Sequence, residues 1–164
     1  MPKNKVKGSK AERELYQMFV DNHYRAVRVA GSGTMENADC DIIAGKKGKK
    51  FCIEVKSSKK PIKYISKEQI NKFITFSEIF NLKPVIAMRF NRIGWFFIKP
   101  KDMKKSDKNF VIDLEIARKK GKRFSQYFKE KINKSIKIND IILNEKELDD
   151  LCVADDCNDI RTKD

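Results

Sequence analysis

Two short segments carry the side chains of this chain that could catalyse metal-dependent cleavage of a phosphodiester. They are residues 41–45 (DIIAG) and 51–56 (FCIEVK), and the stretch between them is rich in lysine and contains a glycine. This arrangement predicts two strands of one hairpin. Because side chains alternate between the faces of a strand, Glu54 and Lys56 share one face with Cys52.

The register of the hairpin decides whether the two acids meet. If residues 46–49 form the turn, Asp41 lies opposite Glu54 with Cβ atoms roughly 5 Å apart. Directly opposed like charges destabilise a sheet, so such a pair survives because a lysine neutralises it or because a cation lies between the oxygens. The spacing alone leaves both interpretations open, a cation site and an ion-pair cluster with Lys56. A slip of one residue in the turn would place the acids on different faces.

Charge is distributed unevenly along the chain. Residues 1–138 hold 34 of the 37 basic and 14 of the 23 acidic residues, a net charge of +20, whereas residues 139–164 carry a net charge of −6. A body this basic predicts a polyanionic partner, of which nucleic acid is the commonest in a cytosol. A lysine-rich proteome would give the same charge without a partner. A membrane surface is disfavoured because no basic amphipathic helix with exposed aromatics stands out.

Length and the remaining features predict one intracellular domain. At 164 residues the chain suits a single core. It has no run of eighteen apolar residues and no signal-peptide segment, so we expect a cytoplasmic, nucleoid-associated protein with no membrane partner. Four unpatterned cysteines suit a reducing compartment. A zinc site is disfavoured, because Cys152 and Cys157 lack a second ligand pair and the only histidine, His23, reads as a surface residue at a helix end.

Periodicity and turn signals predict an α/β fold with a mixed central β-sheet flanked by helices. Residues 1–8 are predicted to be a disordered basic arm, and Ser9 and Glu12 match a capping box for a helix. The expected elements are that helix at 10–22, a strand at 24–30, a loop at 31–37, the hairpin at 39–56, a basic connection at 57–65, a helix at 66–80, strands at 84–90 and 93–98, an edge strand at 110–113, and helices at 123–135 and 145–151.

Two of these elements carry packing predictions. The strand at 93–98 is apolar on both faces, which predicts a central position or a subunit interface. The residues of the helix at 66–80 that we expect to face inward are Ile70, Phe73, Ile74, Ser77 and Phe80.

Four strings closely resemble the archaeal Holliday junction resolvases. They are residues 8–15 (GSKAEREL), 27–32 (VRVAGS), 41–45 and 53–56 (IEVK), within a resemblance that covers residues 5–100. That family consists of dimeric, magnesium-dependent endonucleases with the restriction-endonuclease-like fold. The resemblance implies a nuclease domain over 1–135 and leaves 136–164 as an acidic C-terminal extension without a family counterpart. The loop at 33–40 is a few residues longer than the family pattern.

The resemblance implies a metal site. Asp41 and Glu54 would bind Mg²⁺ together with the backbone carbonyl of Val55, and Mn²⁺ would substitute. Glu12 is similar to the family's helix-borne acid, which reaches the metal directly or through water. Its position also suits the predicted capping box, so a purely structural role stays open.

The resemblance also implies roles at the phosphate. Lys56 would orient or deprotonate the attacking water and offset negative charge in the transition state. Ser32 resembles a loop serine that contacts the scissile phosphate. Taken alone, the basic residues would be solvated charges and Gln69 an ordinary polar residue early in a helix. The residues expected to bind DNA are Arg13, Arg28, Lys59, Lys60, Lys63 and Gln69.

The expected function is symmetric, Mg²⁺-dependent resolution of four-way DNA junctions in homologous recombination and repair, leaving 5′-phosphate and 3′-hydroxyl ends. A homodimer would present two sites to opposite strands. Two alternatives remain, a restriction-type nuclease that cuts linear duplex and a non-catalytic junction-binding or architectural protein. The acidic extension would be a solubilising or partner-binding segment, or an internal mimic of DNA phosphates. The candidate dimer surface, which suits plain core equally, is Phe90, Trp95, Phe96 and Phe97.

Overall fold

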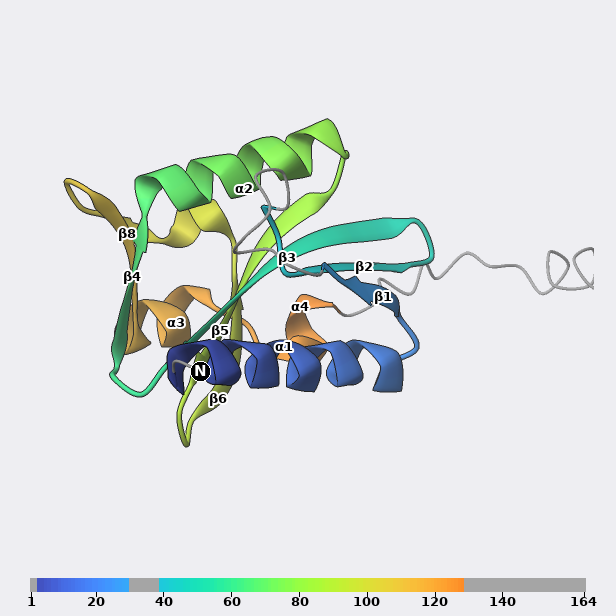
Figure 1. The fold of residues 1–164 in the computed structure, drawn as a ribbon, viewed down its shortest axis with the longest axis horizontal. Coiled ribbons are helices and arrows are strands. Elements are labelled where there is room, and N and C mark those ends of the chain that lie inside the picture. The colour runs from blue at the N-terminus through green and yellow to red at the C-terminus, as the bar shows by residue number, and fades with distance from the viewer. Residues whose placement is uncertain (1–2, 30–38, 129–164) are drawn as a thin grey trace, which may run out of the picture. The chain divides into compact units, whose positions relative to one another are not determined.

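The structure, a computed structural model, describes residues 3–29 and 39–128, with side chains from Lys10 onward in the first range. Helices surround a five-stranded sheet and a three-stranded sheet (Figure 1). In chain order the elements are α1 (Lys3–Asp21), β1 (Arg25–Arg28), β2 (Ile42–Lys46), β3 (Lys49–Ser58), β4 (Ile62–Ser66), α2 (Lys67–Ile79), β5 (Lys83–Phe90), β6 (Gly94–Ile98), η1 (Pro100–Asp102), β7 (Lys104–Lys105), β8 (Asn109–Asp113), α3 (Leu114–Lys120) and α4 (Phe124–Tyr127).

The five-stranded sheet has the order β1-β2-β3-β5-β6. Its central strand, β3, pairs antiparallel with β2 and parallel with β5, and the outer pairs are antiparallel. The sheet is therefore mixed. α1 and α2 lie on opposite sides of it (Figure 1), which confirms the predicted fold class.

Helix α1 is longer than predicted. Ala11, Leu15 and Phe19 recur every four residues and are all buried, so one stripe of the helix faces the sheet. The helix ends near His23, an exposed residue as predicted, whose φ of 60° turns the chain toward β1. Because α1 starts at Lys3, the predicted disordered arm is wrong for residues 3–8. Ser9 lies inside the helix and cannot be its N-cap, so the predicted capping box is also wrong.

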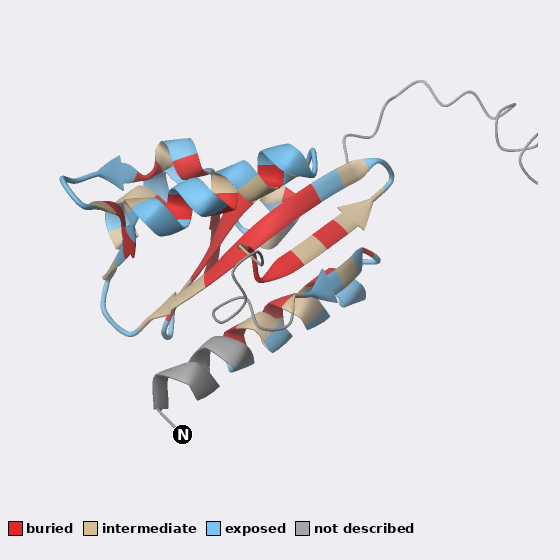
Figure 2. Cartoon of the chain, turned by 45° about the horizontal axis from the view of Figure 1, so that its top comes forward, coloured by how far each residue is buried: buried red, intermediate tan, exposed pale blue. Residues whose placement is uncertain are grey.

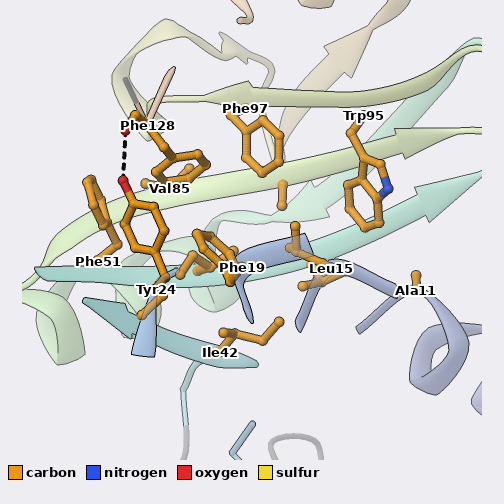
Figure 3. Packing of buried hydrophobic residues seen from close by; sticks show 14 residues of the cluster. Ala11, Leu15, Phe19, Tyr24, Ile42, Phe51, Val85, Trp95, Phe97 and Phe128 are labelled. Atoms are coloured by element: carbon orange, nitrogen blue, oxygen red, sulfur yellow. Dashed lines mark hydrogen bonds between the residues drawn. The ribbon is translucent and has the colours of Figure 1, made fainter. Parts of the chain in front are cut away.

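Aromatic side chains form much of the core on the α1 side of the sheet (Figure 3). The ring of Phe19 lies edge-on to those of Tyr24, Phe124 and Phe128, with centroids 5.5, 5.1 and 5.0 Å apart. The hydroxyl of Tyr24 donates to the carbonyl of Phe128 at 2.7 Å. These contacts anchor α4, the part of the predicted helix at 123–135 that the structure describes.

The two faces of β3 differ as the alternation predicts. Phe51, Ile53 and Val55 pack into the aromatic cluster. Cys52, on the other face, belongs to a second cluster that includes Ile70 of α2. The middle of the strand, residues 51–55, is buried, and Figure 2 shows the middle of β3 in red between less buried ends. Each face of β3 is therefore covered by a different layer.

A second sheet, with strand order β4-β8-β7, completes the layer on the α2 side. The predicted basic connection at 57–65 is wrong, because most of it belongs to β3 and β4. The strand at 110–113 exists as β8, but it is central in its sheet rather than an edge. Helix α3, which the sequence did not predict, follows β8 directly and is capped by Asp113, whose carboxylate accepts from the Ile116 amide at 2.7 Å.

Two packing predictions need correction. β6 is the edge strand of the five-stranded sheet, so its predicted central position is wrong. On its open side, the backbone of Phe97 in β6 exchanges two hydrogen bonds with the backbone of Lys122. In α2, Ile70, Phe73 and Ser77 are buried and Ile74 is partly buried, whereas Phe80 is 56% exposed. Phe80 does not face inward because it is the C-cap that follows the last residue of α2, and it does not belong to the second core cluster.

Several predictions fall outside the described residues. They concern Ser32, the cysteines at 152 and 157, the helix at 145–151 and the acidic extension at 136–164 with its boundary. In the part of the chain that is described, no helix is long and apolar enough to cross a membrane.

Candidate active site

A two-residue turn sets the register of the β2–β3 hairpin. Lys47 and Gly48 have φ of 48° and 75°, the left-handed values that a tight hairpin turn requires and that a glycine adopts without strain. Lys46 pairs with Lys49, so the turn is two residues shorter than the four predicted. The pairing of Gly45 with Lys50 is nevertheless as expected, and the ladder ends at Ile42 opposite Ile53.

Asp41 lies one position before β2 and is tied to the strands on both sides. Its amide donates to the carbonyl of Ile53 at 3.0 Å, and its carbonyl accepts from the amide of Val29 at 2.9 Å. The carboxylate oxygen Oδ2 accepts from the amide of Val55 at 2.7 Å. The side chain is therefore buried and held against the backbone of β3 beside Glu54.

Glu54 is 4% exposed, and its pKa departs from the ordinary value of a glutamate. Burial and the neighbouring charge of Asp41 raise its pKa to about 7, against the partly compensating ion pair with Lys56. The ammonium of Lys56 and the side-chain amide of Gln69, the latter at 2.9 Å, both donate to Oε1 of Glu54. The predicted meeting of the two acids with Lys56 is thus confirmed, and Gln69 joins them from the first turn of α2.

Glu12 pairs with Arg28 rather than capping its own helix. Their side chains are 2.9 Å apart, which links α1 to β1. The charge of Glu12 also contributes to raising the pKa of Glu54, so the helix-borne acid lies within electrostatic range of the pair. Arg13, one residue further along α1, is exposed. These positions bring Glu12 and Arg28 to the margin of the site, where a phosphate or a metal would compete for them.

Glu14 is a residue that the sequence analysis missed. One of its carboxylate oxygens accepts from Nε of Arg89 at 3.0 Å and from the indole nitrogen of Trp95 at 2.8 Å. These bonds outweigh partial burial and lower the pKa of Glu14. They fasten α1 to β5 and β6 two residues from Glu12. One signal could have pointed to this residue: Glu14 directly precedes Leu15, at the edge of the buried stripe of α1.

The donor set fits a hard cation. Two buried carboxylates and the adjacent peptide of Val55 offer oxygen ligands, and Mg²⁺ binds few protein oxygens while keeping several waters. Within the ranges described, no three His, Cys, Asp or Glu residues are grouped tightly enough to enclose a metal. Glu12 is instead held by Arg28, so Asp41 and Glu54 are the carboxylates that a cation here would meet first.

The lysines expected to bind DNA lie between β3 and β4 or on β4 itself. Lys59 and Lys60 are exposed in the turn between β3 and β4, and Lys63 is half-buried on β4. Cys40 and Cys52 are buried free thiols next to the two acids, and a hydrogen bond from Cys40 raises the pKa of Cys52.

The candidate dimer surface needs correction. Its four residues, Phe90, Trp95, Phe96 and Phe97, are each less than 8% exposed within one chain, so they are core.

Comparison with known proteins gives one family. The protein-family model described as "Archaeal holliday junction resolvase (hjc)" matches residues 3–136 of this chain. The protein named crossover junction endodeoxyribonuclease Hjc of Methanocaldococcus jannaschii is 41% identical over 138 residues, covering 83% of this chain and 96% of that protein. The protein of the same name from Archaeoglobus fulgidus is 34% identical, covering 78% of this chain and 99% of that protein.

A solved structure shares the architecture. The crystal structure of Archaeoglobus fulgidus Hjc, described as a Holliday junction resolvase from an archaeal hyperthermophile, superposes with a TM-score of 0.68. It is 28% identical, and the alignment covers 73% of this chain and 98% of that one.

Proposed function

This chain belongs to the archaeal Holliday junction resolvase family, and on that premise we propose that it is an endonuclease that resolves four-way DNA junctions. The observation that carries the proposal is the buried pair of Asp41 and Glu54 with Lys56 beside it. A buried, mutually repelling carboxylate pair costs stability, so a function is a physical reason for its presence.

Mg²⁺ is the cation we propose for this site, with Mn²⁺ as a substitute. When bound, it would polarise the scissile phosphate and lower the pKa of a water. Asp41 and Glu54 would hold it, together with the Val55 carbonyl. The amide of Val55 already fixes the carboxylate of Asp41 in place. Glu54 must lose its proton to do so, and its pKa of about 7 means that binding releases a proton near neutral pH.

Lys56 and the Glu12–Arg28 pair are the groups we propose to act at the phosphate. Lys56, held by Glu54, would orient the attacking water and offset charge as the phosphate becomes pentacoordinate. Arg28 would exchange its bond to Glu12 for one to a DNA phosphate, which would let Glu12 turn toward the metal. Ser32 would contact the scissile phosphate, and Arg13, Lys59, Lys60, Lys63 and Gln69 would support DNA binding.

Substrate choice would follow branched shape and backbone contacts rather than base edges. Cleavage would leave 5′-phosphate and 3′-hydroxyl ends in recombination and repair. We place the protein in the cytoplasm, associated with the nucleoid.

A homodimer is part of the proposal, and α2 offers a face for it. Ile79 and Phe80 are 73% and 56% exposed, and the ring of Phe80 lies 4.6 Å from that of Phe76. The helix Lys67–Ile79 holds two lysines and two glutamates, so this face is neutral in a strongly basic body. A neutral apolar face is where two copies of such a body can meet without strong repulsion.

The dimer face can be tested by introducing charge. Ile79→Glu with Phe80→Glu should convert a dimer into a monomer, measured by light scattering after gel filtration. Val20→Glu, at a 40% exposed position on α1, is the control and should leave the mass unchanged. A dimer that survives the double variant would place the interface elsewhere.

The enzymatic proposal is tested with a synthetic four-way junction and a linear duplex of the same sequence. With Mg²⁺ we expect paired, symmetric cuts in the junction alone, abolished by EDTA. Equal cleavage of the duplex would favour a restriction-type nuclease. Tight junction binding without cleavage under any divalent metal would identify a non-catalytic junction-binding protein and overturn the proposal.

A further inference from the structure

The second sheet has one face in the core and one in solvent. Ile65, Phe110 and Ile112 point into the second core cluster. Because directly paired residues of antiparallel strands share a face, Tyr64 of β4, Val111 of β8 and Lys104 of β7 form a row on the opposite face. We call this opposite face of β4, β8 and β7 the outer face.

The outer face is open and partly aromatic. Tyr64 is 57% exposed and Lys104 is exposed, yet Val111 between them is only 6% exposed. Val111 belongs to neither core cluster, as its place on the outer face requires. Tyr64 is therefore a large exposed side chain on this face, and more than half of its surface is available to a ligand.

Lysines lie near both ends of the strands that form the outer face. The turn with Lys108 lies beside the end of β4, where the amide of Lys67 donates to the carbonyl of Lys108 at 3.3 Å. At the opposite end, the turn from β3 to β4 carries Lys59 and Lys60, both exposed. An exposed aromatic ring between groups of lysines is the arrangement by which proteins hold unstacked nucleic acid, with phosphates on the cations and a base on the ring.

The outer face is also continuous with the catalytic strand. β4 follows β3 after a short turn, and β4 and β8 lie at the side of the molecule opposite the tip of the β2–β3 hairpin (Figure 1). β4 has five residues, about 17 Å at about 3.4 Å each, which matches about five base steps of one duplex strand. DNA bound at the site of Glu54 and Lys56 on β3 could therefore extend onto the outer face, which begins with the next strand of the chain.

We propose that the outer face is a second DNA-binding surface, on which the ring of Tyr64 stacks against an unpaired base at the branch point while the flanking lysines contact phosphates. The proposal rests on branched DNA being the substrate. It adds a contact that recognises a disrupted helix, which a linear duplex does not offer. Nothing in the cleavage chemistry depends on it.

The test measures binding without cleavage. The probes are a fluorescent four-way junction carrying two unpaired thymines at the branch point and a linear duplex of equal length, titrated in EDTA and followed by anisotropy. Tyr64→Ala should weaken junction binding about tenfold and leave duplex binding within about twofold, because stacking contributes on this order per base. Tyr64→Phe should retain junction affinity, since the ring remains.

Lysine variants separate the phosphate contacts. Lys104→Ala with Lys108→Ala, at two exposed positions, should weaken binding to both probes and reduce the salt dependence by about one unit of slope per lysine. Lys50→Ala with Lys83→Ala removes the same charge from two exposed positions at the hairpin side of the sheet. This control should have the smaller effect.

Three results would overturn the proposal. Tyr64→Ala could bind the junction as the wild type does, or Tyr64→Phe could lose as much affinity as Tyr64→Ala, which would mean a hydroxyl contact instead of stacking. Tyr64→Ala could also change the mass in solution, which would make the outer face a subunit interface. Because no metal is present, these outcomes are distinct from failure of the enzymatic proposal, which would appear as absent junction cleavage by the wild type.

Discussion

The two faces of β3 affect stability in opposite ways. One face places Phe51, Ile53 and Val55 in the aromatic cluster. The other buries Glu54 next to Asp41 and an ion pair. Burying each large apolar side chain contributes about 1.5–3 kcal/mol. Raising the pKa of Glu54 from 4.5 to about 7 corresponds to about 3 kcal/mol against the ionised folded state. The apolar face of β3 thus stabilises the strand, whereas the charged face destabilises it.

The largest expected effect comes from breaking the apolar layer. Phe19→Ala should lower the free energy of unfolding by about 3–5 kcal/mol, because Phe19 is fully buried against three aromatic rings. Urea denaturation measures this. Val20→Ala, at the neighbouring exposed position, should change stability by less than about 0.5 kcal/mol. Similar losses for both variants would show that the α1 stripe is not what supports β3.

The charged face of β3 should make the free energy of unfolding depend on pH. Glu54 has a raised pKa, so the folded state holds its proton between pH 4.5 and about 7, and the unfolded state does not. The contribution of Glu54 is therefore fully favourable below pH 4.5 and is lost, by about 3 kcal/mol, as pH rises through 7. Asp41→Asn removes one cause of the shift, so its fall in stability should be smaller. Urea denaturation in EDTA from pH 4.5 to 8 measures both, and parallel curves would contradict this assignment.

A smaller effect is expected where α1 is fastened over the sheet. Glu14→Ala removes the bonds to Arg89 and Trp95 and should cost about 1–2 kcal/mol, since the carboxylate is partly exposed. Junction cleavage should also fall, because α1 carries Glu12. Gln17→Ala, an exposed change on the same helix, is the control. If Glu14→Ala left both stability and cleavage unchanged, the bonds to β5 and β6 would not position α1.

The sequence predicted what depends on short-range periodicity. The alternation along β3 placed Glu54 and Lys56 on one face, and the register through Gly45 and Lys50 held although the turn is shorter. A two-residue turn and a four-residue turn give the same pairing of the flanking strands, so the error in turn length did not matter.

Long-range contacts were beyond the sequence. The chain around Lys59 and Lys63 is polar and contains a proline, and it becomes strand β4 only because β8 pairs with it. The partners of Glu12 and Glu14 lie on strands far along the chain, so local spacing suggested a helix cap for the first and nothing for the second. Tertiary pairing therefore decided what local propensity could not.

The most direct test of the contrast between the faces is Glu54→Gln, measured for unfolding at pH 8 in EDTA and for junction cleavage with Mg²⁺ in the same preparation. Gln keeps an acceptor for Lys56 and Gln69 but removes the buried charge. We predict a variant more stable than the wild type, by about 1–3 kcal/mol, whose cleavage is at least about 10³-fold slower. A variant that is less stable, or that cleaves the junction at the wild-type rate, would contradict the assignment of Glu54 as a strained catalytic carboxylate.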